Sequence, residues 1–440
     1  MKRQMISASA IAIALTLSQW AMAQQTMTLR ECIDYAAEHS TTIRQKQIAV
    51  EQKENSLSTQ KGDYMPSVYG YANQNFDFGR GLTSDNTYTN RNTRSTSLGI
   101  SANMTLFDGL QNVNGVRVAK LNLAAATEDL QAAKEDLGIS VAQAYLTVLC
   151  DKEIAQAAHE QAELSKAQLE RKEALLRNGK TSESDVYEAR SLVAQDEVTA
   201  IKADNDYKLA LLDLSQLLEL PSPEGFDVAM PDTTVALSDL DSPDAIYQEA
   251  LTGKASVRAA QTRANAAEKQ ISVAKGAYAP TLSLSAGIST GFYGIAGEEN
   301  ESAGTQFGQN LDKSISLSLS VPIFNRFATR NNVRAAKMDY TSSVVELEET
   351  RKSLYKEIQQ AYYNAVAAKA TYEGSTAAAE SAEAAFRLAD GKYAAGLSTS
   401  TEYAEARTNR ITALANKIQY KYEMLFRAKI LDFYRGAEIE

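Results

Sequence analysis

The sequence predicts a mainly helical fold in which one unit, containing helices and a β-hairpin, occurs twice. The first observation is a Tyr-x-Pro segment at Pro66, a predicted helix–strand junction, which returns at Pro280, 214 residues later. The second is a longer segment, 178–190, whose pattern returns at 395–407 with an offset of 217. The third is that the second part of each copy lacks proline. A repeat of this length has to be recognised before single elements are assigned, because it decides the fold.

Long helices are predicted in the stretches without proline. A proline inside a helix costs about 3 kcal/mol, so its absence permits unbroken helices over 110–177 and 327–394. At 1.5 Å per residue each helix would be roughly 100 Å long, far longer than helices in globular domains. Each is followed by a turn and a returning helix, over 183–219 and 400–434. A shorter helix over 28–64 is expected before the first hairpin.

The β-hairpins are predicted from the alternation of apolar and small polar residues. In the first copy the strands cover 67–78 and 95–107, joined by a loop at 79–94. In the second copy the hairpin covers 281–324, with its loop at 294–312. Period-two alternation predicts strands with one apolar and one Ser-rich face, and their length suits tilted strands that cross a membrane. A soluble hairpin with one face on a core is the alternative interpretation.

The first 23 residues are predicted to be a secretory signal peptide, 1–23. Lys2 and Arg3 provide positive charge, residues 6–17 form a short apolar core, and 21–23 (Ala-Met-Ala) have the pattern that signal peptidase recognises. The apolar core is too short to cross a bilayer as a helix, and no later segment is long enough. This leaves the periplasm, secretion or an outer-membrane β-barrel as destinations.

Composition and motifs argue against nucleic-acid binding and against an enzyme. The predicted signal peptide holds two basic and no acidic residues, so the mature charge is 43 − 55 = −12, which disfavours nucleic acid. His39 and His159 have no partner at metal-ligand spacing, and no nucleophile elbow, phosphate loop or dinucleotide fingerprint occurs. We expect no catalytic residue, cofactor or metal. Cys32 and Cys150, the only cysteines, are predicted to be buried free thiols.

Four strands in a membrane would require several copies of the chain. Lipid does not tolerate open sheet edges, and eight strands are the usual minimum for a closed barrel. Three copies would supply twelve strands, although these considerations alone do not distinguish three copies from two or four. A closed ring would also cover the apolar seams of the long helices.

The order of short motifs resembles the TolC-like family of outer-membrane efflux proteins. The motifs are Tyr-x-Pro before each first strand, Leu-Phe-Asp-Gly at 106–109, Tyr-x-x-Gly-x-Ser at 393–398, and acidic-x-x-x-Ala-Arg beyond each turn. Each motif alone is weak, but their order, spacing and duplication extend over nearly the whole mature chain. The chain then divides into a first repeat at 24–220, a linker or equatorial segment at 221–244, and a second repeat at 245–440 that ends in a C-terminal equatorial segment.

The resemblance implies a homotrimer in the outer membrane with a large periplasmic part. Its twelve-stranded β-barrel would lie among outer-membrane lipids, and its twelve-helix α-barrel would extend into the periplasm. The implied function is passive conduction of drugs and toxic small molecules to the exterior. An inner-membrane pump of the resistance–nodulation–division or ABC type and a periplasmic adaptor (membrane fusion protein) would be the partners. Type I secretion of polypeptides and metal-cation export are alternatives, and a periplasmic coiled-coil adaptor or structural protein is a more distant one.

The resemblance also implies that the two turns meet the adaptor. The residues concerned are those of the two tips: Gly179, Lys180, Thr181, Gly396, Leu397 and Ser398. The alternative interpretation is that Gly179 and Gly396 simply end helices, as glycine often does.

A constriction beyond the second tip is implied as well. Glu402 and Glu405 match two acidic rings of the family, and three copies would place six carboxylates around one axis, where they select cations. A solvated charged face is the alternative. Tyr393 and Asp185 match two residues of the family's gate, but Ser398 stands where the family has arginine. Lys180, Arg177 or a different network would have to replace that arginine.

Overall fold

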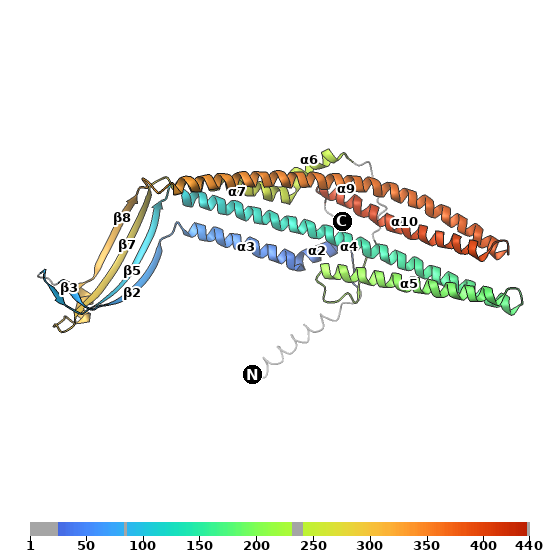
Figure 1. Cartoon of the computed structure of the whole chain (residues 1–440), viewed down its shortest axis with the longest axis horizontal. Coiled ribbons are helices and arrows are strands. Elements are labelled where there is room, and N and C mark those ends of the chain that lie inside the picture. The colour runs from blue at the N-terminus through green and yellow to red at the C-terminus, as the bar shows by residue number, and fades with distance from the viewer. Residues whose placement is uncertain (1–24, 83–85, 231–240, 438–440) are drawn as a thin grey trace, which may run out of the picture. The chain divides into compact units, whose positions relative to one another are not determined.

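The computed structural model describes residues 25–82, 86–230 and 241–437 (Figure 1). The predicted signal peptide and residues 231–240 of the predicted linker lie outside the described residues. The chain forms two compact units, and each draws on both repeats. The first combines residues up to 47 with 129–258 and those from 350 onward, and the second combines 48–128 with 259–349.

The second unit contains a four-stranded antiparallel sheet. Its strands are β2 (Ser67–Asp77), β5 (Thr93–Phe107), β7 (Thr281–Ile295) and β8 (Asp312–Ser320), in the order β2-β5-β7-β8. The two predicted hairpins are therefore confirmed, and they join each other through their inner strands β5 and β7. The edge strands β2 and β8 are exposed along their whole length.

The register of the sheet separates an apolar face from a small polar face. Ile100 lies opposite Ile288 on one face, whereas Asn103 lies opposite Ser285 on the other. Because successive side chains in a strand point to opposite faces, this register confirms the predicted alternation.

The loops of the sheet contain elements that the sequence pattern did not predict. A small ribbon of β3 (Arg80–Leu82) and β4 (Tyr88–Asn90) lies in the first loop, and α8 (Ala303–Gln309) lies in the second. Gln306 accepts from the backbone N–H of Tyr293 (2.9 Å) and donates to its carbonyl oxygen (3.0 Å). This amide occupies the edge of β7 beyond the point where β8 ends, since the pairing of β8 reaches only Ser289.

Two glycines allow a close approach at the helix–strand junctions of the second unit. Gly109 follows β5 with φ +72°, and a Cβ at this position would lie 2.2 Å from the carbonyl oxygen of Gly276. Gly276 ends α7 (Ala255–Gly276), and Pro280 precedes β7 directly; Pro66 stands in the same place before β2.

The prediction of one continuous helix over 28–64 is wrong, because the structure has two helices there, separated at Ser40. It consists of α2 (Leu29–His39) and α3 (Thr41–Gly62), and Ser40 has an extended ψ of 126°. The second copy has the same break at Lys254, 214 residues later, between α6 (Pro243–Gly253) and α7. Ser40 and Lys254 are both buried. Neither break is marked in the sequence by a proline.

The four long helices agree with the prediction. They are α4 (Gln111–Arg177), α5 (Glu183–Leu217), α9 (Ala328–Ala394) and α10 (Ser400–Tyr434). Figure 1 shows α5 running back along α4, and α10 along α9. None of the helices in the described ranges is both long and apolar enough to cross a membrane.

The core of the first unit joins its helices to a two-stranded parallel sheet. The strands are β1 (Gln25–Met27) and β6 (Phe226–Val228), so the linker does contribute a strand. Tyr145 of α4 donates hydrogen bonds from its hydroxyl to the carbonyl oxygens of Met27 (3.3 Å), at the end of β1, and of Ala229 (2.5 Å), directly after β6. Cys32 and Cys150 are buried in this core as free thiols, as predicted.

Candidate functional site

The two helix tips have the same backbone conformation. Gly179 (φ +66°) and Gly396 (φ +75°) adopt the left-handed conformation that glycine tolerates best. At each tip the next residue closes the turn: Lys180 N–H donates to the Leu175 carbonyl (2.9 Å), and Leu397 N–H donates to the Lys392 carbonyl (2.8 Å). This hydrogen-bond pattern is a common way to end an α-helix. A Cβ at either glycine would meet no atom within 4 Å, so the positive φ alone favours glycine.

Asp185 caps the helix that leaves the first tip. It forms a capping box with Ser182, and its carboxylate accepts hydrogen bonds from the hydroxyls of Ser182 (2.6 Å) and Thr181 (2.8 Å) and from the Ser182 N–H (3.0 Å). These hydrogen bonds, led by that from the Ser182 hydroxyl, lower the pKa of Asp185 to about 2, and the charge of Lys172 contributes.

Glu402 has the equivalent place at the second tip. It forms a capping box with Thr399, and its carboxylate accepts from the Ser398 hydroxyl (2.6 Å) and the Thr399 N–H (3.1 Å). These bonds lower the pKa of Glu402, with the Ser398 hydroxyl contributing most. Ser398 therefore bonds to an acid of its own tip. Glu405 is exposed, and its carboxylate has no partner among the described residues.

Tyr393 contacts the first hairpin through a lysine. Lys172 of α4 donates a hydrogen bond to the Tyr393 hydroxyl (3.2 Å), and its ammonium lies 4.4 Å from the ring centroid. The Tyr393 ring stacks on that of Tyr403, with centroids 4.7 Å apart. Within the described part of the chain, no hydrogen bond joins Tyr393 to Asp185. Lys172 supplies a positive charge near both residues.

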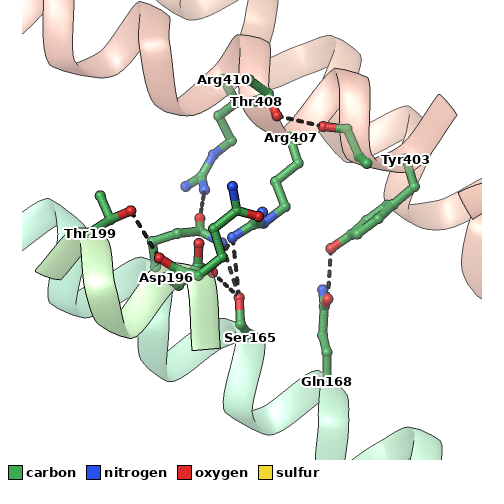
Figure 2. A network of polar contacts seen from close by, with 11 residues as sticks. Ser165, Gln168, Asp196, Thr199, Tyr403, Arg407, Thr408 and Arg410 are labelled. Atoms are coloured by element: carbon green, nitrogen blue, oxygen red, sulfur yellow. Dashed lines mark hydrogen bonds and ion pairs between the residues drawn. The ribbon is translucent and has the colours of Figure 1, made fainter. Parts of the chain in front are cut away.

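A buried polar network lies further along the same helices (Figure 2). The guanidinium of Arg407 on α10 forms an ion pair with Asp196 on α5 and donates to the hydroxyl of Ser165 on α4 (3.4 Å). Ser165 in turn donates to Asp196. The side chains of Arg407 and Asp196 are only 5% and 7% exposed, so this pair is shielded from water.

Two further side chains of α10 flank this ion pair. Arg410 donates to the side-chain oxygen of Gln161 on α4 (3.0 Å) and pairs with Glu383 on α9. On the other side, the Tyr403 hydroxyl donates to Gln168 of α4 (2.7 Å). The two helical hairpins of one chain are thus joined by side chains from α4, α5, α9 and α10.

The sequence analysis did not identify this network. It noted Arg407 only as part of a repeated Ala-Arg motif, and the other members were not singled out. A signal was present, however, because polar residues recur at spacings of four and three on two helices that are otherwise rich in alanine. These residues are Gln161, Ser165 and Gln168 on α4, and Tyr403, Arg407 and Arg410 on α10.

No arrangement suited to a metal occurs in the described ranges, where no group of three His, Cys, Asp or Glu side chains converges. His159 contacts Asp204 at 2.9 Å, but both side chains are substantially exposed. The polar groups of this region join helices to one another.

Comparisons with known proteins agree with this architecture. A sequence model of the outer membrane efflux protein family matches residues 32–219 and 246–436. The protein CyaE of Bordetella pertussis is 24% identical over 414 residues, covering 92% of this chain and 83% of its own. The outer membrane efflux protein BepC of Brucella suis is 23% identical over 377 residues, covering 84% and 76%. The crystal structure of the outer membrane protein VceC of Vibrio cholerae has a TM-score of 0.75 at 20% identity, covering 94% and 97%.

The fold and the helix tips thus define a helical outer-membrane channel protein with a duplicated architecture. The chain belongs to the outer membrane efflux protein family. It is an outer-membrane efflux channel of the kind that works in tripartite systems, and it is not an enzyme.

Proposed function

We propose that this chain forms a homotrimeric exit duct that passively conducts small molecules from the periplasm to the exterior. A periplasmic adaptor and an inner-membrane pump would supply docking and energy. The observation that carries the proposal is the four-stranded sheet, whose edge strands β2 and β8 are exposed throughout and leave unpaired backbone groups. Pairing of β8 with β2 of the next copy satisfies those groups, and three copies close a sheet of twelve strands.

Membership of the efflux family supports a cargo of drugs or toxic compounds. BepC, by its name, is an efflux protein, and it matches most of this chain. Type I secretion and metal-cation export remain alternatives that the same duct would serve, since the pump selects the cargo.

The constriction proposed here consists of Glu402, Glu405, Asp185 and Tyr393. Its support is that these residues lie at the tip ends of α5, α9 and α10, that Lys172 of α4 lies near both Tyr393 and Asp185, and that Glu405 is exposed. In a trimer, Glu402 and Glu405 would contribute six carboxylates around one axis and would favour cations.

Three measurements test the duct itself. The purified protein should migrate as a heat-labile trimer from the outer-membrane fraction and should conduct ions in planar bilayers. A strain that lacks the chain should become sensitive to drugs and should recover on complementation. A water-soluble monomer without conductance would overturn the proposal.

The tips are proposed as the adaptor-docking residues: Gly179, Lys180, Thr181, Gly396, Leu397 and Ser398. Their exposure supports this, because Leu397 is 79% exposed in the turn between α9 and α10. A photo-crosslinking residue at Leu397 should capture the adaptor, whereas the same residue at Leu388, which is 69% exposed on α9, should not. Equal capture at both positions would contradict docking by the tips.

A further inference from the structure

We propose that Arg407 is a positioning residue for the acidic constriction. Together with Tyr403 and Arg410 it fixes the rotation of α10, so that Glu402 and Glu405 face away from α4. The inference rests on the proposed function, because it assigns a role in the constriction of a conducting channel.

The contacts between α4 and α10 form an antiparallel series with matched spacing. Three pairs follow one another along the two helices: Gln161 with Arg410, Ser165 with Arg407, and Gln168 with Tyr403. The spacing of four and three residues on both helices is that of a single helix face. One continuous face of α10 is therefore held against one continuous face of α4.

The acidic residues lie on another part of the α10 surface. At 3.6 residues per turn, each residue advances about 100° around the helix. Arg407 then lies about 40° to one side of Tyr403, and Arg410 about 20° to the other. Glu402 lies about 100° and Glu405 about 160° from Tyr403, so the anchored face and the acidic face are largely opposed. The burial of Tyr403 and Arg407 and the exposure of Glu402 and Glu405 agree with this arrangement.

The ion pair of Arg407 is the contact that opposes rotation most strongly. Turning α10 by one residue would separate Arg407 from Asp196 and leave two charges without partners in a site shielded from water, which is costly. The capping bonds of Glu402 to Ser398 and Thr399 are local to the tip, so they turn with the helix and cannot set its rotation.

The first repeat lacks this anchor and supplies a control. The positions equivalent to Tyr403, Arg407 and Arg410, 217 residues earlier, are Val186, Arg190 and Val193. Arg190 is 60% exposed in its ion pair with Glu173. Removal of its charge therefore changes the net charge as removal of Arg407 would, but it leaves the rotation of α10 unaffected.

The test uses the purified full-length channel in planar bilayers. Cation selectivity and block by hexaamminecobalt(III) from the periplasmic side are compared for the natural protein, Arg407→Met, Arg407→Lys and Arg190→Met. Arg407→Met should weaken block about fivefold or more. This factor is expected when one carboxylate moves out of near contact with the cation in water. Arg407→Lys should restore part of the block, and Arg190→Met should leave it unchanged.

A second set of variants separates positioning from a general structural effect. In a Glu402→Gln, Glu405→Gln background, Arg407→Met should change block no further, because the acids through which it acts are gone. If Arg407→Met does not assemble, Tyr403→Phe, which loses only the hydrogen bond to Gln168, takes its place and should give a smaller change of the same sign.

The outcomes also separate this inference from the proposed constriction. If Glu402→Gln and Glu405→Gln leave selectivity and block unchanged, the constriction itself is wrong. If these two substitutions change selectivity and block but the Arg407 and Tyr403 variants do not, only the positioning role is overturned. The same holds if Arg407→Met changes block equally when Glu402 and Glu405 are already glutamine.

Discussion

Arg190 and Arg407 occupy equivalent positions in the two repeats, yet Arg190 is exposed in a pair with Glu173 of its own hairpin, whereas Arg407 is buried against Asp196 of the other hairpin. The duplication thus placed an arginine at the same position of each repeat, and the neighbouring side chains determine whether it is exposed or buried. An exposed ion pair contributes little to stability, whereas a buried one is costly to break. Near the tips, the repeats therefore differ in their side-chain contacts, while the backbone turns at Gly179 and Gly396 remain alike.

Loss of the Asp196 charge should destabilise the protein strongly. Asp196→Asn leaves Arg407 charged and unpaired in a buried site, which costs about 3–5 kcal/mol. Glu173→Gln removes the exposed partner of Arg190 and should cost less than about 1 kcal/mol. Thermal unfolding of the detergent-solubilised protein measures both.

A double substitution provides the control for this prediction. Asp196→Leu with Arg407→Met removes both charges, so most of the stability lost in Asp196→Asn should return. Equal melting temperatures for Asp196→Asn and Glu173→Gln would contradict the shielded ion pair.

Gly109→Ala should disrupt assembly, because the new Cβ would lie 2.2 Å from the Gly276 carbonyl oxygen at a positive φ. Both the turn after β5 and the end of α7 would have to move. Gly179→Ala, also at a positive φ but without neighbours, should cost only about 1–2 kcal/mol. The yield of heat-labile oligomer on gels compares the two. Normal yield from Gly109→Ala would show that the junction tolerates displacement.

The order of the elements could be predicted because each followed from a pattern local to the sequence. Alternation identified the strands around Ile100 and Ile288, and the absence of proline identified α4 and α9 to within one residue. The breaks at Ser40 and Lys254 could not be found this way, because neither is marked by a proline and both residues are buried. The partners of Arg407 could not be predicted from local sequence patterns either, since Asp196 and Ser165 lie 211 and 242 residues away along the chain.

The two cysteines should be unreactive in the folded protein. Burial raises the pKa of the Cys32 and Cys150 thiols to about 12, so almost no thiolate is present at neutral pH. Maleimide should label neither before unfolding and both afterwards, as mass spectrometry of the intact chain would record. Leu397→Cys, at an exposed position, should add one label in the folded protein. Labelling of the natural chain as fast as that of this variant would contradict the packing of the core.

The first turn of α5 should lose protection in acid within a defined pH range. The pKa of Asp185 is lowered to about 2 by hydrogen bonds that exist only when the tip is folded. A folded-state pKa below the unfolded value of about 3.9 means that the charged cap stabilises the helix start above about pH 4. That contribution declines as the pH falls from about 4 and is gone below about 2.

Hydrogen exchange of residues 182–186 measures this effect once intrinsic rates are corrected for pH. Protection should stay constant from pH 7 to 5 and fall between pH 4 and 2. Asp185→Asn should be less protected at pH 5 and should show no further loss in that range, because it has no carboxylate to protonate. If the natural chain and Asp185→Asn lose protection in parallel, the carboxylate does not cap this helix in solution, and the hydroxyls of Thr181 and Ser182 must have other partners.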